Sequence, residues 1–188
     1  MKKVLYSAWA GVLVLATAHS AQSQSREQQL TTIAQLVKEE GEVFVAIDQF
    51  NVRLNRTCTL EDYFSNQITF GRDSATIRFL NHTESACETT QLHSEADFRF
   101  SLQDVDPVRL VLVKKKYDLG KRKLSDGQDS WFEIHFFTRQ NRALISRKDV
   151  ASGEKELSNT VRLLFKSGDG ARKTLSALRE VLGVATTN

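Results

Sequence analysis

The sequence predicts an α+β fold: an antiparallel sheet or a partly open β-barrel, with an N-terminal helix and a C-terminal capping helix. Three observations support this class. Apolar residues recur at three- and four-residue spacing in a segment near Glu27 and again near the C-terminus. Between these two segments, most of the chain alternates with period two. Strands that run together, separate from the helices, favour α+β over an alternating α/β fold.

The N-terminus has the layout of a secretory signal peptide, which we assign to residues 1–21. Lys2 and Lys3 give a positive start, an apolar run follows, and Ala16-Thr17-Ala18 is a small-residue cleavage pattern. The run is shorter than the ~20 residues that span a bilayer, so a permanent anchor is the weaker alternative. No cysteine lies nearby to carry a lipid. We therefore expect a periplasmic or secreted protein.

The remaining residues, 22–188, are expected to form a single α+β domain. Hydrophobic residues are 40% of the chain and charged residues 26%, a composition that can bury a core and is not typical of disorder. The only proline is Pro107, and no Pro- or Gly-rich linker divides the chain. No second apolar stretch is long enough to cross a membrane, so the mature chain is predicted to lack a transmembrane segment.

Two cysteines, Cys58 and Cys87, are predicted to form a disulfide. An even pair of cysteines in an oxidising compartment most often forms a disulfide. In the chain-entropy model, this disulfide would stabilise the folded chain by roughly 3–4 kcal/mol. A metal site needs more ligands than this spacing offers, and a thiol nucleophile needs a base that nothing in the sequence identifies.

The elements follow from the local pattern. Glu27 to Glu40 reads as an amphipathic helix that stops at Gly41. The segment from Thr57 to Ser65 is interpreted as a turn or short helical stretch, and the polar segment from Asn81 to Thr90 as a loop held by the disulfide. The predicted strands are 43–54, 67–70, 76–80, 96–102, 108–114, 131–138, 143–147 and 160–166, with Gly71 to Ser74 as a hairpin turn.

The last element is a predicted helix from Ala171 to Leu182, with Leu175, Leu178 and Leu182 on one stripe. Asp169 is the expected N-cap, and Gly183 is the expected stop.

Charge is unevenly spread between the two halves. Residues 26–105 hold seven Lys/Arg and thirteen Asp/Glu, whereas residues 106–188 hold seventeen and ten. Such asymmetry either marks a face for a partner or disappears if the halves interleave in space.

The second half resembles the pleckstrin-homology-like superfamily over residues 96–183. Phe98 to Val113 leads from a strand through a short acidic turn to another strand, and Thr160 to Leu178 ends a strand and opens a helix. The resemblance implies a bent antiparallel sheet or partly open barrel capped by the last helix. It also implies binding rather than catalysis, although the leader and the disulfide differ from the cytosolic members that bind phosphoinositides.

The most distinctive local feature is the basic segment from Lys114 to Lys123. Six of its ten residues are basic, and we expect them to form an exposed hairpin tip around Gly120: Lys114, Lys115, Lys116, Lys121, Arg122 and Lys123. Such a tip attracts anionic lipid heads, phosphates or an acidic protein. With Tyr117 as its only aromatic residue, it is a poor nucleic-acid platform. The alternative is a solvated loop that only keeps the chain soluble.

Glu133 and His135 lie two residues apart on a predicted strand and so share a face with Trp131 and Phe137. A carboxylate beside an imidazole can perform acid–base chemistry or supply half of a metal site. No spacing supplies further ligands, so a partly covered packing surface is the simpler interpretation. His82 and His93 are expected in loops.

The sequence carries no phosphate loop, dinucleotide fingerprint or nucleophile elbow. We therefore predict no cofactor and no metal. The expected function is an exported binding or interaction module without catalytic activity, which uses the basic segment to contact a protein or anionic surface ligand in the cell envelope. The alternative is an envelope hydrolase that uses Glu133 and His135.

Overall fold

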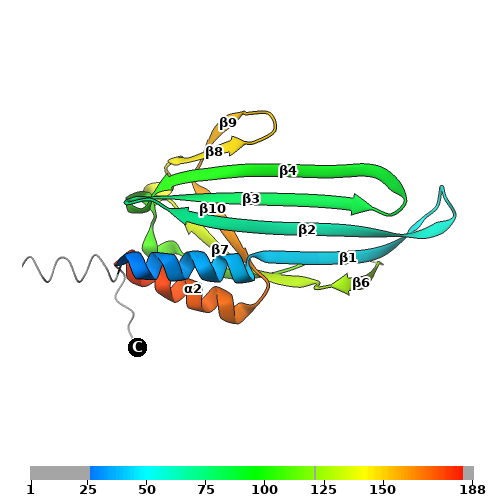
Figure 1. Cartoon of the computed structure of the whole chain (residues 1–188), viewed down its shortest axis with the longest axis horizontal. Coiled ribbons are helices and arrows are strands. Elements are labelled where there is room, and N and C mark those ends of the chain that lie inside the picture. Colours follow the sequence, from blue (N-terminus) through cyan, green and yellow to red (C-terminus); the bar gives the residue numbers. More distant parts are fainter. Residues whose placement is uncertain (1–25, 121, 184–188) are drawn as a thin grey trace, which may run out of the picture.

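The computed structural model describes residues 26–120 and 122–183, without the side chains of residues 88–91. The predicted signal peptide therefore lies outside the described residues. The α+β class is confirmed: helical residues 26–40 and the C-terminal helix accompany two antiparallel sheets, which do not close into a barrel (Figure 1). The elements are β1 (Glu42–Asn51), β2 (Arg56–Phe70), β3 (Ser74–Ser85), β4 (Glu88–Ser101), β5 (Val111–Lys116), β6 (Lys123–Gly127), β7 (Ser130–Phe137), β8 (Ile145–Asp149), β9 (Lys155–Ser158), β10 (Thr160–Phe165) and α2 (Gly168–Val181), with short 3-10 turns at Leu102–Asp104, Pro107–Arg109 and Arg139–Asn141.

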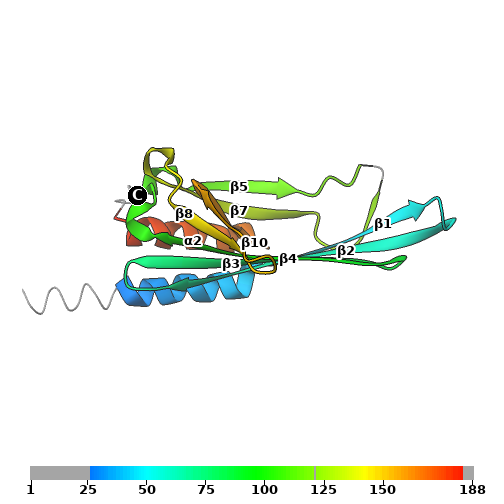
Figure 2. The same ribbon diagram turned by 90° about the horizontal axis from the view of Figure 1, so that it is seen from above.

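The large sheet has seven strands in the order β6-β1-β2-β3-β4-β8-β9, and the small sheet has the order β10-β7-β5. Figure 2 shows the large sheet edge-on, with β5 and β7 raised above one of its faces. The second half of the chain supplies β6 on one side of the large sheet and β8 and β9 on the other. The acidic and basic halves of the sequence therefore interleave in space.

Two expectations about the first half are wrong. The segment 57–65 is part of the long strand β2, and residues 81–85 and 88–90 continue β3 and β4 instead of forming a loop. The alternation was hidden because polar residues occupy inward positions: Asp62 and Asn66 are buried on β2. Strands β6 and β9 were not predicted because their residues are almost all exposed and show no alternation.

The predicted disulfide is confirmed. Cys58 at the start of β2 is bonded to Cys87 in the turn between β3 and β4, with 5.5 Å between the two Cα atoms. β2 and β3 pair from Leu60 and Ser85 to Phe70 and Ala75, so the bridge fastens the hairpin just beyond the end of this pairing that lies opposite the β2–β3 turn.

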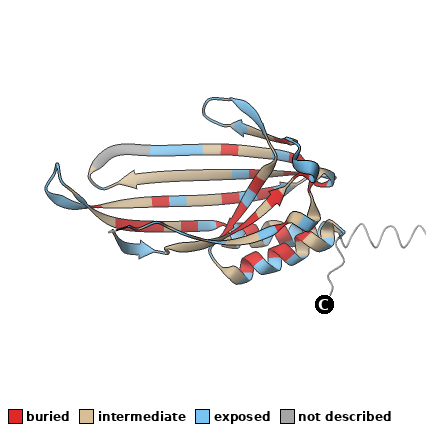
Figure 3. Ribbon diagram, turned by 180° about the vertical axis from the view of Figure 1, so that it is seen from behind, coloured by how far each residue is buried: buried red, intermediate tan, exposed pale blue. Residues whose placement is uncertain are grey.

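The main core lies between the helices, the small sheet and the half of the large sheet that is beside the helices. Ile33 and Val37 of the N-terminal helix, Ile77 of β3, Phe136 of β7 and Leu178 of α2 are all buried in it. In Figure 3 the buried residues gather where the helices, β7 and β10 meet the large sheet. This packing holds β10, an edge strand of the small sheet, against β2.

A second, smaller core lies at the far end. Val43, Val45 and Ile47 of β1 are buried there beneath Tyr117, Leu119 and Trp131, which come from the small sheet and the segment that follows β5. The two cores use the same face of the large sheet, the face over which β5 and β7 lie (Figure 2).

The C-terminal helix α2 is confirmed, but its cap differs from the expected one. The Ser167 side chain accepts a hydrogen bond from the Gly170 N–H, so Ser167 and not Asp169 is the N-cap. Asp169 lies in the first turn, where its carboxylate pairs with Lys173 at 2.8 Å. That position suits a carboxylate because the N-terminal end of a helix carries partial positive charge.

Candidate functional site

The basic segment does not form the tip of one hairpin, contrary to expectation. Lys114, Lys115 and Lys116 lie on β5, which pairs with β7 in the small sheet. Lys123 lies on β6, which pairs with β1 in the large sheet, opposite Asp48. The segment is therefore a crossover that joins the two sheets, and Figure 2 shows it descending from β5 to the edge of the large sheet.

The described cations of the segment have different surroundings. The Lys116 ammonium lies 3.4 Å from Asp129. Arg122 donates to the carbonyl oxygens of Asp118 and Leu119, so its guanidinium holds the turn together. Among the described residues, Lys114, Lys115 and Lys123 have no carboxylate within ion-pair distance. Lys121 lies outside the described residues.

Strand β5 is an edge strand, and this gives its lysines a second role. One side of β5 pairs with β7, and no described strand pairs with the other. Lysines on an edge strand oppose the addition of a strand from another chain, because the incoming strand would have to pack against their charged side chains. Lys114 and Lys116 point to one face of the small sheet and Lys115 points to the other, so the edge strand carries positive charge on both faces.

Glu133 is the centre of a buried polar network on β7. Its carboxylate accepts hydrogen bonds from Trp131 Nε1 at 3.0 Å, His135 Nε2 at 2.7 Å and Arg162 Nη1 at 3.3 Å. Glu133 is 1% exposed, whereas the Arg162 side chain is 50% exposed. The shared face predicted for Trp131, Glu133 and His135 is confirmed.

The network keeps Glu133 ionised. Burial by itself raises the pKa of Glu133, but the hydrogen bonds from Trp131 and His135 and the charge of Arg162 outweigh it, so the pKa lies below its ordinary value. A carboxylate with a lowered pKa and three donors already in place is a weak general base. Its clearest role is to orient Arg162 and His135.

A second buried carboxylate, Asp62 on β2, was missed by sequence reasoning. It accepts hydrogen bonds from the Thr83 hydroxyl at 2.6 Å and from the Tyr117 hydroxyl. Desolvation and this bond raise the pKa of Tyr117 to about 12. Asp62 therefore connects the large sheet to the basic segment, and only long-range pairing brings these residues together.

The outward face of the large sheet carries an aromatic stripe that sequence reasoning also missed. Phe44, Tyr63, His82 and His93 lie side by side on β1 to β4, with ring centroids 4.6, 6.2 and 5.9 Å apart in turn. The two histidines lie on strands, not in loops as expected. The two residues of each successive pair lie directly opposite each other on neighbouring strands, and this relationship can be recognised only once the strand register is known.

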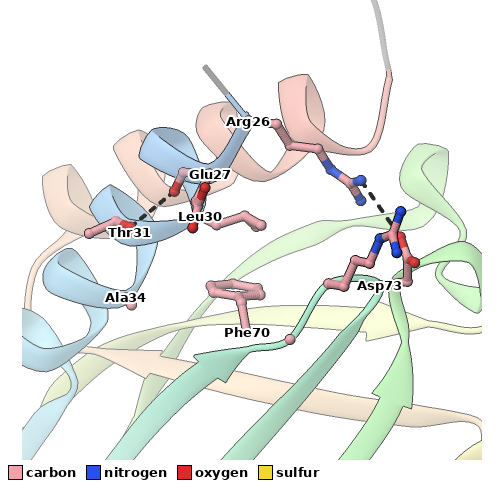
Figure 4. A pocket seen from close by; sticks show the side chains of 9 residues that line it. Arg26, Glu27, Leu30, Thr31, Ala34, Phe70 and Asp73 are labelled. Atoms are coloured by element: carbon pink, nitrogen blue, oxygen red, sulfur yellow. Dashed lines mark hydrogen bonds and ion pairs between the residues drawn. The ribbon is translucent and has the colours of Figure 1, made fainter. Parts of the chain in front are cut away.

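A pocket lies beside the start of the N-terminal helix, between that helix and the β2–β3 turn (Figure 4). Leu30, Ala34 and Phe70 supply its apolar lining, and Arg26 pairs with Asp73 at 3.7 Å across it. It adjoins the point where the described chain begins, so we assign no site to it.

The described residues contain no group of three or more His, Cys, Asp or Glu side chains arranged to hold a metal ion. Within the same residues, no helix has the length and apolar character needed to span a membrane. A scan against protein-family models, a search of curated proteins and a search of solved structures each found no match to this chain.

Proposed function

We propose that this chain is a small exported binding module without catalytic activity, and that its basic segment contacts an anionic partner in the cell envelope. The observation that carries the proposal is the unneutralised charge of Lys114, Lys115 and Lys123, which no described carboxylate pairs. Lys114 and Lys115 lie on β5 of the small sheet, and Lys123 lies on β6 of the large sheet. Because the two sheets fix both ends of the segment, its charges are presented without a large loss of chain entropy on binding.

The surroundings of Glu133 support binding over the hydrolase alternative. Acid–base catalysis with this pair requires Glu133 to exchange a proton, yet its carboxylate accepts from Trp131, His135 and Arg162 together. Exchanging any of these donors would leave a buried charge less well solvated. The resemblance to pleckstrin-homology-like domains, which usually bind and do not catalyse, points the same way.

A triple variant tests the proposal. Lys114→Gln, Lys115→Gln and Lys123→Gln together should weaken binding to phosphatidylglycerol vesicles and flatten its salt dependence, because exposed charges act through a screened field. The matched control is the triple variant Lys38→Gln, Lys148→Gln and Lys155→Gln, which removes the same charge from exposed positions elsewhere. Phosphatidylcholine vesicles serve as the uncharged surface.

The two variants separate the possible outcomes. Equal weakening in both would mean that net charge alone attracts the protein, and no binding by the unmodified chain would exclude an anionic lipid surface. Retention of an acidic envelope protein on the immobilised chain, lost only in the first triple variant, would instead identify a protein as the partner. Export is tested by sequencing the N-terminus of protein recovered from the envelope, which should begin between His19 and Gln24.

A further inference from the structure

A second pocket opens between the two sheets, away from the basic segment. Its volume is about 480 Å³, within the range of ordinary small-ligand sites. Six strands line it: β3 and β4 from the floor, β7 and β10 from the small sheet, and β8 and β9 from the side. None of its lining residues belongs to the segment from Lys114 to Lys123, so the pocket and the proposed partner surface are separate sites.

Arg162 is one of two arginines that line this pocket, and the other is Arg147. The Arg162 guanidinium lies over the Phe79 ring at 5.6 Å and meets Glu133 through one nitrogen at 3.3 Å. Half of the side chain is exposed, and its other guanidinium nitrogen atoms make no hydrogen bond to a described residue. A guanidinium held flat on one side and free on the other offers paired N–H donors, the arrangement that a carboxylate accepts best.

Asn81 contributes a hydrogen-bond acceptor, whereas Arg162 offers donors. Its side-chain oxygen is buried and has no hydrogen-bond partner among the described residues, although an unpartnered buried acceptor is costly. Asn81 and Phe79 lie two positions apart on β3 and point to the same face, roughly 7 Å from each other. Asn81, which lacks a donor, and Arg162, which lies over Phe79, thus line the same pocket.

The remaining charges around the pocket largely cancel. Arg147 pairs with Glu156 at 2.5 Å, Arg162 with Glu133, and Glu95 with Arg78 at 3.2 Å. The Asp149 carboxylate accepts from the Ser152 N–H and hydroxyl. A ligand with a large net charge would disturb these pairs, so a molecule that carries both signs fits better than a phosphate or a polyamine.

Most of the lining is polar, but one part of it is apolar. Phe79 and Phe98 lie on neighbouring strands at the pocket, and Ala96 and Val161 line it between the polar groups. From these features together we propose that the pocket binds a zwitterionic α-amino acid with an apolar side chain. Arg162 holds the carboxylate, the Asn81 oxygen accepts from the ammonium group, and the side chain packs against the two phenylalanines.

Titration calorimetry with three probes tests the inference. L-Phenylalanine carries both charged groups, 3-phenylpropanoate lacks the amino group, and 2-phenylethylamine lacks the carboxylate. We expect L-phenylalanine to bind at least about tenfold more tightly than either analogue, since each lost charged contact is worth about a factor of ten or more. The inference is overturned if L-phenylalanine, L-leucine and L-tryptophan show no binding at millimolar concentration, or if either analogue binds equally well.

Two variants assign the roles. Arg162→Gln should weaken L-phenylalanine and 3-phenylpropanoate alike, whereas Asn81→Ala should weaken L-phenylalanine only. Arg99→Gln, at an exposed position on β4, is the control and should change neither. If Arg162→Gln is too unstable to measure, Arg162→Lys keeps the charge that Glu133 faces but loses the planar pair of donors, and a several-fold loss is expected. Unchanged affinities in the Arg162 and Asn81 variants would show that L-phenylalanine binds outside this pocket and would overturn the inference.

Discussion

The side chain of Asn66 on β2 hydrogen-bonds both backbone groups of Leu164 on β10. Its amide oxygen accepts from the Leu164 N–H, and its Nδ2 donates to the Leu164 carbonyl oxygen at 3.3 Å and to the Gly41 carbonyl oxygen at 3.2 Å. One buried side chain thus substitutes for a neighbouring strand at the edge of the small sheet. It also fixes the chain where the N-terminal helix passes into β1, at a glycine with no room for a Cβ.

Asn66→Ala should therefore lower the free energy of unfolding by about 1–3 kcal/mol, because the variant leaves the buried backbone groups of Leu164 without partners. Urea denaturation monitored by circular dichroism measures the change. Gln67→Ala, at the exposed neighbouring position, is the control and should stay within about 0.5 kcal/mol of the original chain. Equal stability of the two variants would show that water replaces the Asn66 contacts at no cost.

Loss of the disulfide should destabilise the chain without changing its fold. Cys58→Ser and Cys87→Ser are each expected to cost roughly 2–5 kcal/mol, with little further loss in the double variant, because either change removes the same bridge. Thiol titration of the unmodified protein, purified without reductant, should detect no free thiol. Additive losses in the double variant would mean that the two side chains act separately.

The Glu133 network should make the free energy of unfolding decrease as the pH falls into the acid range. Because the pKa of Glu133 is lowered in the folded chain, the unfolded chain takes up the proton first as pH falls. The contribution of Glu133 is therefore present above the ordinary carboxyl range and is lost as pH falls through the lowered pKa. In Glu133→Gln, denaturation curves measured from neutral to acid pH should show a smaller loss of stability, from a starting value about 1–3 kcal/mol lower. An unchanged pH dependence would contradict this role.

Tyr117 should produce the opposite dependence at alkaline pH. Its pKa is raised to about 12, first by desolvation and then by the hydrogen bond to Asp62, so the folded chain keeps the proton when the unfolded chain has lost it. That contribution is complete below the ordinary tyrosine pKa of 10.0 and is lost as pH rises through the folded value. Tyr117→Phe should be less stable at neutral pH but lose less stability on alkaline titration. Absorbance titration of the native chain should show one phenol that ionises near the upper value.

Local sequence patterns predicted the elements that have one apolar side. The helix before Gly41, the helix with Leu175 and Leu178, and the strand with Phe132, Ile134 and Phe136 all show a clear periodicity because one face of each meets a core. The same patterns failed at Asp62 and Asn66, which occupy inward positions with polar side chains. They also failed for β6 and β9, whose residues face solvent and have no apolar side to detect.

The candidate sites divide in the same way. The basic segment and the Glu133–His135 pair are contiguous or share one strand, so spacing alone identified them. Arg162 and Asn81 are far from both in sequence, and only the packing of β10 against the large sheet brings them to one pocket.

The sequence by itself determined the α+β class, the cysteine pair and the residues that carry unusual charge, because these depend on composition and on periods of a few residues. Only the tertiary structure decided that the basic segment crosses between sheets, that acidic and basic halves interleave, and that Asn66 supports the edge of β10. Each of these depends on which strands become neighbours. Neighbours are selected by the burial of both cores together and by the hydrogen bonds that buried polar groups require.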